Sequence, residues 1–197
     1  MFTGIIESEG IVKKIGINGS NKTFWIKSDI SKKLKPDQSV SHDGVCLTIE
    51  EIKKDLHRVT AIAETLKKST INNWQEGSMI NLERSLRLSD RLDGHFVLGH
   101  IDATGICLEV SEKVGSREYR FSVPGEFVNL LIEKGSICIN GVSLTIFNVS
   151  DSAFTVAIIP HTFKKTNFKA IEKNSLVNIE LDVLGKYVNR ITSLNSA

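Results

Sequence analysis

The sequence has few cysteines and no pattern that would organise them. Cys46, Cys107 and Cys138 are odd in number and show no CxxC spacing, which argues against a disulfide framework and against a zinc site. Cys107 and Cys138 stand in apolar, strand-like contexts that are typical of small core residues. We therefore expect reduced thiols and no metal site.

Long apolar runs and a dominant charge are also missing. No stretch approaches the roughly 20 apolar residues that a membrane-spanning helix needs, and the first residues lack the basic start of a secretory signal. The formal net charge is only +2, with lysines interleaved among acids, so there is no electrostatic footprint for nucleic acid or anionic lipid. We expect a cytoplasmic protein without a membrane or nucleic-acid partner. The lack of a dinucleotide glycine fingerprint disfavours a flavin reductase.

What the sequence does contain is a repeat. Residues 43–49 read Asp-Gly-Val-Cys-Leu-Thr-Ile and residues 140–146 read Asn-Gly-Val-Ser-Leu-Thr-Ile, and the register holds without a gap from 39–83 against 136–180. The repeat predicts two homologous halves of roughly 90 residues each. Several identical pairs are polar, beyond what packing requires: Thr48/Thr145, Thr65/Thr162, Lys67/Lys164, Asn81/Asn178 and Glu83/Glu180. They suggest two equivalent pockets, although the repeated phrase can also be read simply as a good bend-and-strand sequence.

Each half has the pattern of a small barrel. Short apolar or alternating runs, separated by Gly, Asn and Ser, are typical of strands and turns. Helical turns are expected at 29–35 and 64–70 in the first half and at 124–133 in the second. Six short strands in each half suggest a closed barrel, which leaves no sheet edge open to aggregation.

Residues 184–194 have no counterpart in the repeat. Their apolar side chains recur at helical spacing and their polar side chains take the other face, which predicts an amphipathic helix. The apolar stripe either lies on its own barrel or meets copies from other subunits. We favour oligomerisation, because both barrels already look closed.

Several motifs together carry a family resemblance. The opening Met-Phe-Thr-Gly-Ile-Ile, the phrases ending Cys-Leu-Thr at 46–48 and Ser-Leu-Thr at 143–145, the Gly-His pairs at 94–95 and 99–100, and Asn-Ile-Glu-Leu-Asp at 178–182 resemble the riboflavin synthase α-chain family. The resemblance covers nearly the whole chain. It implies an all-β protein of two tandem six-stranded Greek-key barrels and a C-terminal α-helix that forms a homotrimer. The implied domains are lumazine-binding barrels at 1–92 and 93–183 and an oligomerisation helix at 184–197.

The family also implies an activity. Two molecules of 6,7-dimethyl-8-ribityllumazine exchange a four-carbon unit without a cofactor, giving riboflavin and 5-amino-6-ribitylaminouracil in the last step of riboflavin biosynthesis. Lumazine and riboflavin are the implied ligands, and lumazine synthase is a possible partner. The main alternative is a non-catalytic lumazine or flavin carrier of the same fold. Retained polar site residues favour the enzyme.

The reaction requires two unlike pockets, because one molecule loses a proton from its C7 methyl group and the other accepts a nucleophile at C7. The aligned halves differ at Cys46/Ser143, Glu64/His161, Asp37/Lys134, Ser85/Asp182 and Ile5/His100. An imidazole changes charge near working pH, which suits His100 to proton transfer. Ser143 and Thr145 share one side of a strand and can present hydroxyls to the methyl group or its anion. The resemblance assigns activity to His100, Ser143, Thr145, Cys46 and Asp182.

Some of these residues have a simpler reading. Cys46 can serve as a nucleophile, a proton donor or a polar contact, or can be one more buried thiol. His95 fits a packed or hydrogen-bonded role better than catalysis. Lys134 can contact substrate or be solvated at a helix end, and Phe2 can cover a pocket or anchor the first strand. Asn140 stands where family members often carry Asp, and we expect it to serve a turn.

Substrate contacts are implied in both halves. In the first they are Phe2, Gly4, Ile5, Ile6, Ser39, Cys46, Leu47, Thr48, Thr60, Ala61, Ile62, Ala63, Glu64 and Thr65. In the second they are Gly99, His100, Ile101, Lys134, Ser143, Leu144, Thr145, Ile159, Pro160, His161, Thr162, Phe163 and Lys164. Backbone groups and hydroxyls at these positions suit a flat pyrimidinedione and a flexible ribityl chain.

Overall fold

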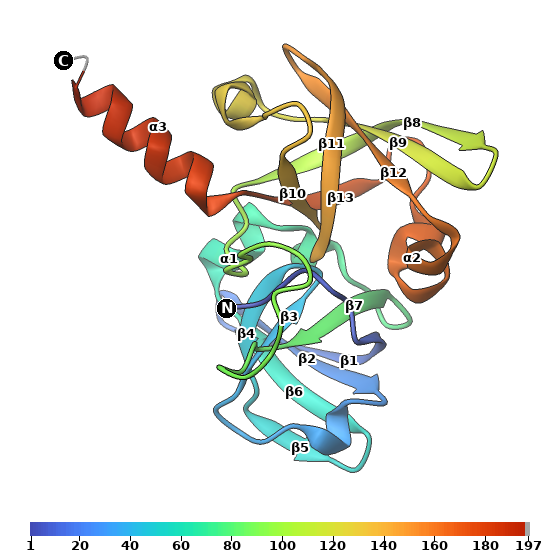
Figure 1. Cartoon of the computed structure of the whole chain (residues 1–197). Helices are drawn as coiled ribbons and strands as arrows, with labels where there is room; N and C mark the ends of the chain where they lie inside the picture. The colour runs from blue at the N-terminus through green and yellow to red at the C-terminus, as the bar shows by residue number, and fades with distance from the viewer. Residues whose placement is uncertain (196–197) are drawn as a thin grey trace.

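The computed structural model describes residues 1–195 and consists of two β-barrels followed by a helix (Figure 1). The last two residues of the predicted tail, 196 and 197, lie outside the described residues. The first half contains β1 (Ser8–Asn18), β2 (Asn21–Ser28), β3 (Ser39–His42), β4 (Val45–Thr48), β5 (Glu51–Lys53), β6 (Leu56–Ala61), α1 (Ala63–Lys68) and β7 (Met79–Arg84). The second contains β8 (Ala103–Lys113), β9 (Ser116–Ser122), β10 (Ser136–Ile139), β11 (Val142–Ser150), β12 (Ala153–Ile158), α2 (Pro160–Lys165) and β13 (Leu176–Leu181).

The second half forms a closed barrel in the order β10-β11-β12-β9-β8-β13. The first half has the order β4-β3-β7-β1-β2-β6-β5, in which the two outer strands are consecutive in the chain. Only two residues separate β4 from β5, and one of them, Glu50, donates its backbone N–H to the carbonyl of Arg58 at 2.9 Å. Together β4 and β5 match the single strand β11. The expected pair of six-stranded barrels is confirmed.

Alternation along the strands fills each barrel with apolar side chains. The first core gathers around Phe24, Ile26 and Leu82, none of which has exposed surface. The second is richer in aromatic rings, with Tyr119 and Phe168 in edge-to-face contact at 5.2 Å between ring centroids. Burial of these side chains provides the main driving force for folding each half.

The helical turns of the first half lie near their predicted places, as the 3-10 helix Ser31–Lys33 and as α1. Two further 3-10 turns, Thr70–Asn73 and Asn167–Ala170, follow α1 and α2. The helix expected over 124–133 is wrong in type and length, because the chain forms a 3-10 helix at Gly125–Leu130. It stops there because Leu131 takes extended backbone and buries its side chain in the barrel core.

The barrels meet through a pair of matching turns. Asp43 and Asn140 both have positive φ, 48° and 46°, which confirms the turn role expected of Asn140. The next residues, Gly44 and Gly141, approach so closely that a Cβ on Gly44 would lie 2.8 Å from the nitrogen of Gly141. Glycine is required there because only a residue without a side chain fits both this contact and a φ near +80°.

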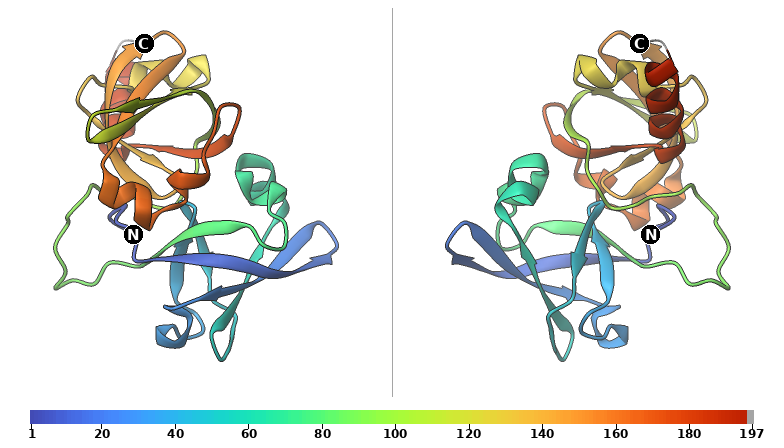
Figure 2. Two further views of the ribbon diagram at one scale, coloured as in Figure 1. Left: turned by 90° about the vertical axis from the view of Figure 1, so that its right-hand side faces the viewer. Right: turned by 90° about the vertical axis from the view of Figure 1, so that its left-hand side faces the viewer.

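The terminal helix α3 (Val183–Asn195) projects away from both barrels (Figure 1). Leu184, Tyr187 and Ile191 are 58%, 67% and 59% exposed, so the apolar stripe does not pack on the chain's own barrel. Figure 2 shows the two halves stacked and the loop after β7 arcing away from the body before it enters the second half. Within residues 1–195, no helix combines the length and apolar character needed to cross a membrane.

Candidate functional site

Two short segments, residues 2–6 and 97–101, lead into the first and second barrels. Each of these lead segments lies against the barrel of the other half. Residues 2–6 precede the first barrel, yet the carbonyl of Gly4 accepts a hydrogen bond of 2.8 Å from the backbone N–H of Ser143 in the second. Likewise the carbonyl of Gly99 accepts one of 2.8 Å from the N–H of Cys46 in the first. Each lead segment therefore lies against the barrel of the other half, and each candidate site combines residues of both.

Glycine allows these approaches. A Cβ on Gly4 would lie 2.5 Å from the Cβ of Ser143, and one on Gly99 would lie 2.6 Å from the Cβ of Cys46. Real side chains do not come this close, and both glycines also have a φ near +80° that L-residues rarely adopt. Any larger residue would push the lead segment off the opposite barrel.

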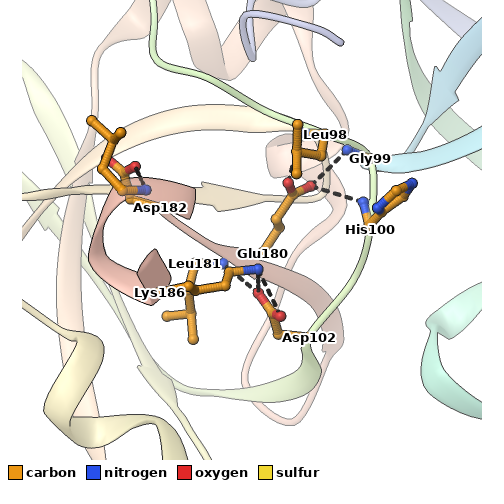
Figure 3. Close-up of polar contacts among 9 residues, drawn as sticks. Leu98, Gly99, His100, Asp102, Glu180, Leu181, Asp182 and Lys186 are labelled. Atoms are coloured by element: carbon orange, nitrogen blue, oxygen red, sulfur yellow. Dashed lines mark hydrogen bonds and ion pairs between the residues drawn. The ribbon is translucent and has the colours of Figure 1, made fainter. Parts of the chain in front are cut away.

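Two matching glutamates hold the lead segments. Glu83 on β7 accepts the N–H groups of Thr3 and Gly4 at 2.7 and 2.9 Å. Glu180 on β13 accepts the N–H groups of Leu98, Gly99 and His100 at 2.7, 2.9 and 3.1 Å, as Figure 3 shows. Burial raises the pKa of both carboxyl groups, and the backbone N–H donors oppose that rise.

The second-barrel pocket contains a hydroxyl–imidazole pair. Ser143 Oγ and His95 Nδ1 lie 2.7 Å apart, and the backbone N–H of His95 donates to the carbonyl of Thr3 at 3.1 Å. Burial lowers the pKa of His95, while the negative charge of Asp182 opposes the shift. A neutral imidazole results near pH 7, and its Nε2–H tautomer leaves Nδ1 free to accept the serine proton.

The other candidates for this pocket surround the pair. Thr145 lies two residues along β11 and is exposed. Asp182 ends the barrel and accepts the N–H of Leu184 at 3.0 Å, so it also begins α3. Ser143, Thr145 and Asp182 are thus brought to one end of the second barrel together with His95.

His100 and Cys46 belong to the other pocket. Cys46 is half-buried on β4, and the segment that carries His100 crosses directly beside it. Figure 3 shows the His100 ring turned away from Glu180, and the ring is exposed. The structure therefore places Ser143, Thr145 and Asp182 beside one barrel, and Cys46 and His100 beside the other, rather than gathering the five predicted residues in one place.

The predicted substrate contacts follow the same division. Around the first barrel, Thr48 pairs with Ser39 across β3 and β4, Thr60 Oγ1 lies 3.2 Å from the hydroxyl of Thr23, and the exposed Glu64 forms an ion pair with Lys68 at 3.2 Å. The exposed or half-exposed positions are Ile5, Ile6, Ile62, Ala63 and Thr65 in the first half, and Ile101, Leu144, Ile159, Pro160, His161, Thr162, Phe163 and Lys164 in the second.

Five predicted contacts are buried, namely Phe2, Gly4, Leu47, Ala61 and Gly99. Phe2 and Ala61 have no exposed surface and Leu47 is 6% exposed. In this arrangement no surface of Phe2 or Ala61 is open to a ligand. Phe2 packs with Val97, to which its backbone is bridged, so the anchoring role is the one this packing supports. Lys134 is exposed, with its ammonium 5.3 Å from the centroid of the Phe147 ring.

A cavity of about 610 Å³ lies beside the lead segment of residues 2–6. Predicted contacts Ile5 and Ser39 line it together with Thr3 and Glu83.

Within the part of the chain that the structure describes, no three His, Cys, Asp or Glu side chains are grouped as a metal site. Cys107 and Cys138 are buried free thiols, as the sequence predicts.

Sequence reasoning missed three residues of this arrangement. His95 is packed and hydrogen-bonded as expected, but its partner is the predicted catalytic Ser143. Glu83 and Glu180 are an identical pair in the aligned repeat, but the sequence alone assigns no role to either residue. A buried acid retained in both halves was the available signal, because it needs partners that only the fold supplies.

Comparisons with known proteins identify the repeated unit. The model of the lumazine binding domain matches the chain twice, at residues 3–85 and 98–182. Riboflavin synthase of Bacillus amyloliquefaciens is 37% identical over 191 residues, covering 96% of this chain and 89% of the relative. Riboflavin synthase of Actinobacillus pleuropneumoniae is 36% identical, with the same coverage.

A solved structure supports the same fold. The crystal structure of LumP complexed with 6,7-dimethyl-8-(1'-D-ribityl) lumazine superposes with a TM-score of 0.83 at 26% identity, over 91% of this chain and 98% of the other. Two matched domains and enzyme relatives over nearly the full length place this protein among transferases. The chain belongs to the riboflavin synthase family of lumazine-binding double-barrel enzymes.

Proposed function

We propose that this protein catalyses the dismutation of two 6,7-dimethyl-8-ribityllumazine molecules to riboflavin and 5-amino-6-ribitylaminouracil. The observation that carries the proposal is the hydroxyl–imidazole pair of Ser143 and His95 in one of two matched but unlike pockets. The two products together contain every atom of the two substrates, so a four-carbon transfer needs no external oxidant or cofactor. The chain's residues supply binding and proton transfer.

In this proposal the second-barrel pocket removes the proton. Ser143 takes a proton from the C7 methyl group of one lumazine as its own proton passes to His95 Nδ1, 2.7 Å away. Thr145 offers a hydroxyl to the resulting anion, and Asp182 stabilises the protonated His95 through its charge. An imidazole with a lowered pKa is neutral at pH 7 and can accept the proton.

The first-barrel pocket then prepares the acceptor. Cys46 lies beside the segment that carries His100, so these two residues can deliver a nucleophile to C7 of the second lumazine, or a proton to the ring atom that takes up the displaced electron pair. Glu64 and Thr48 are exposed polar groups suited to the ribityl hydroxyls and ring N–H groups. In this proposal each chain carries one site of each kind, and the reaction joins a site of one subunit to the unlike site of the next.

We further propose a homotrimer formed by α3, with the domain limits 1–92, 93–183 and 184–197. The exposed apolar stripe of α3 supports this assembly, because such a stripe is unfavourable in water. Cytoplasmic localisation and an association with lumazine synthase belong to the same proposal.

An optical assay tests the activity. Purified protein mixed with the lumazine alone should convert its absorbance and fluorescence to those of riboflavin, with one riboflavin formed for every two lumazines consumed. The rival is a non-catalytic carrier, which the LumP–lumazine complex makes a concrete alternative. A carrier would retain unconverted lumazine, and that result would refute the proposed enzyme.

Truncation after Asp182 tests the assembly. The shortened chain should sediment as a monomer with folded barrels and should lose turnover, because pockets from two subunits no longer meet. A matched control is Lys165→Ala, an exposed substitution on α2 that leaves α3 intact. A truncated chain that still sediments as a trimer would refute the role of α3.

A further inference from the structure

We propose that Glu83 and Glu180 are positioning residues that act across the barrels, each setting the geometry of the candidate pocket in the barrel to which it does not belong. The effect on turnover rests on the proposed function. The structural part of the proposal stands on hydrogen bonds alone.

Glu180 shapes the first-barrel pocket. It stands on β13 of the second barrel and is 1% exposed. One carboxylate oxygen accepts the N–H of Leu98, and the other accepts those of Gly99 and His100. Because Glu180 holds the N–H groups of the segment, the carbonyl of Gly99 points the other way, toward the first barrel. There it accepts a hydrogen bond of 2.8 Å from the backbone N–H of Cys46. The position of His100 relative to Cys46 therefore depends on a carboxylate of the opposite barrel, whose contacts with the segment are drawn in Figure 3.

Glu83 shapes the second-barrel pocket by the same geometry. It stands on β7, is 4% exposed, and accepts the N–H of Thr3, the hydroxyl of Thr3 and the N–H of Gly4. The carbonyl of Gly4 then accepts the N–H of Ser143, and the carbonyl of Thr3 accepts that of His95. Both members of the hydroxyl–imidazole pair are thus tied to a segment that Glu83 holds.

A carboxylate is required in both places because it only accepts hydrogen bonds. Glutamine replaces one oxygen with an NH₂ group, which would face a backbone N–H donor and leave both unpaired in a buried site. The lead segment would then have to move away. The shape change is small in volume, so a variant can report on position without opening a cavity.

Asp102, which follows the same lead segment, makes a second set of contacts with the second half. The carboxylate of Asp102 accepts the N–H of Leu181 at 2.8 Å and forms an ion pair with Lys186 of α3 (Figure 3). Asp102 lies two residues after His100, so its ion pair with Lys186 connects the segment of His100 to the terminal helix. Because it stays intact in Glu180→Gln, the variant should shift the segment locally without releasing α3.

The thiol of Cys46 provides a readout of the first pocket. It is half-buried, whereas Cys107 and Cys138 are buried, so a small thiol reagent should react first with Cys46. In the full-length protein, Glu180→Gln should raise the rate of Cys46 modification about tenfold, because local opening is easier once the segment loses its acceptors. Glu83→Gln is the comparison variant and should raise that rate by less than Glu180→Gln does, because Glu83 acts on the segment beside Cys46 indirectly, through the bridge between Phe2 and Val97. Cys46→Ser gives the background from the other two thiols.

Two glycine variants test the same idea without touching the glutamates. Gly99→Ala should raise the Cys46 rate as Glu180→Gln does, since its Cβ would press on the Cβ of Cys46. Gly4→Ala presses on Ser143 instead and should leave the Cys46 rate near wild type. Equal Cys46 rates in the Glu83 and Glu180 variants, or a larger rate in Glu83→Gln, would overturn the proposal.

Kinetics separate positioning from general damage. Both glutamate variants should lower kcat about tenfold or more. A cooperative urea unfolding transition should show that both are still folded. Wild-type kcat and KM in Glu180→Gln would overturn the positioning role even if lumazine turnover is confirmed. If the wild-type protein does not turn lumazine over, the proposed function fails, while the Cys46 rates still decide whether Glu180 acts across the barrels.

Discussion

The two barrels share a backbone but differ in what they bury. His42 and His57 lie fully inside the first barrel, and the matching positions of the second are Ile139 and Phe154. At the contact between the barrels, the first contributes Asp43 and the second Asn140. At these three positions the first half buries an ionisable side chain, where the second half has an apolar or neutral one.

The histidines form a neutral hydrogen-bonded chain. His42 donates from Nδ1 to the carbonyl of Val40 at 2.9 Å, and the Nε2 atoms of the two rings lie 3.0 Å apart. His57 Nδ1 lies 2.8 Å from the hydroxyl of Ser31, which continues to Ser28. Every ring nitrogen has a partner when both histidines are neutral. Burial lowers the pKa of His57 to about 4 and holds that of His42 well below its ordinary value.

Burial shifts the pKa of Asp43 upward, in the direction opposite to that of the histidines. Its carboxylate accepts the N–H of Asn81 at 2.7 Å and the amide of Asn167 at 2.9 Å, yet burial dominates and raises its pKa to about 8. A duplicated fold thus tolerates unlike interiors as long as each polar group finds partners. The difference predicts that the pH dependence of stability resides mainly in the first half.

The largest expected effect concerns the pockets. Ser143→Ala should lower kcat about 10²–10³-fold with riboflavin affinity within about threefold, because the hydroxyl acts on a proton rather than on binding. Cys46→Ser, at the matching position of the first barrel, should cost less, since a hydroxyl replaces a thiol without removing the polar contact. Stopped-flow turnover and riboflavin titration measure both. Equal losses in kcat and affinity for Ser143→Ala would assign this residue to binding.

The next effect tests the histidine chain. The unfolded histidines bind protons near pH 6.5 and the folded ones resist them, so their contribution to stability is lost as the pH falls from about 6.5 toward 4. His42→Ile with His57→Phe copies the second barrel. On going from pH 7 to pH 5, its unfolding free energy should improve relative to wild type by roughly 2 kcal/mol or more, the amount expected from His57 alone. Urea unfolding at both pH values checks this, and a constant difference would break the comparison.

Asp43→Asn should act with the opposite sign. The unfolded carboxyl ionises near pH 4 and the folded one near pH 8, so the stability that Asp43 contributes is lost as the pH rises between these values. On going from pH 5 to pH 7 the variant should gain about 2 kcal/mol relative to wild type. The same urea series measures it. A gain in the acid direction would place the responsible group elsewhere.

The smallest effect is expected on the other side of the contact. Asn140→Asp should leave kcat within about twofold, because Asp43 shows that an aspartate fits this left-handed turn. The assay is turnover at saturating lumazine, with Asn140→Ala as the control that removes the turn side chain. A tenfold rise in kcat would mean that an acid at this position takes part in proton transfer.

Several features could be predicted from particular residues. The repeated phrase fixes two halves because a register held over 39–83 and 136–180 has no other simple origin, and apolar alternation selects strands. The amphipathic spacing after Asp182 predicts α3 within a residue or two. Ser143 could be proposed as a site residue because its hydroxyl stands where the first half has the thiol of Cys46, and Thr145 because the same threonine recurs as Thr48.

The pairing of residues could not be predicted in the same way. Aligning the halves set Ile5 against His100 and Cys46 against Ser143, but alignment cannot reveal that residues 2–6 lie on the second barrel and 97–101 on the first. The hydrogen bond between His95 and Ser143 joins residues 48 positions apart. Periodicity reports only which face of a strand is buried, and it contains no information on such distant partners.

By itself, the sequence determined the duplicated β-architecture and the terminal helix, because strand alternation and helical spacing are local properties of consecutive residues. Only the tertiary structure decided that each pocket combines one barrel with the lead segment of the other, and that Glu83 and Glu180 hold those segments. The physical reason is that buried carboxylates and backbone N–H groups must find partners. Which partner each one finds depends on how the two barrels pack together.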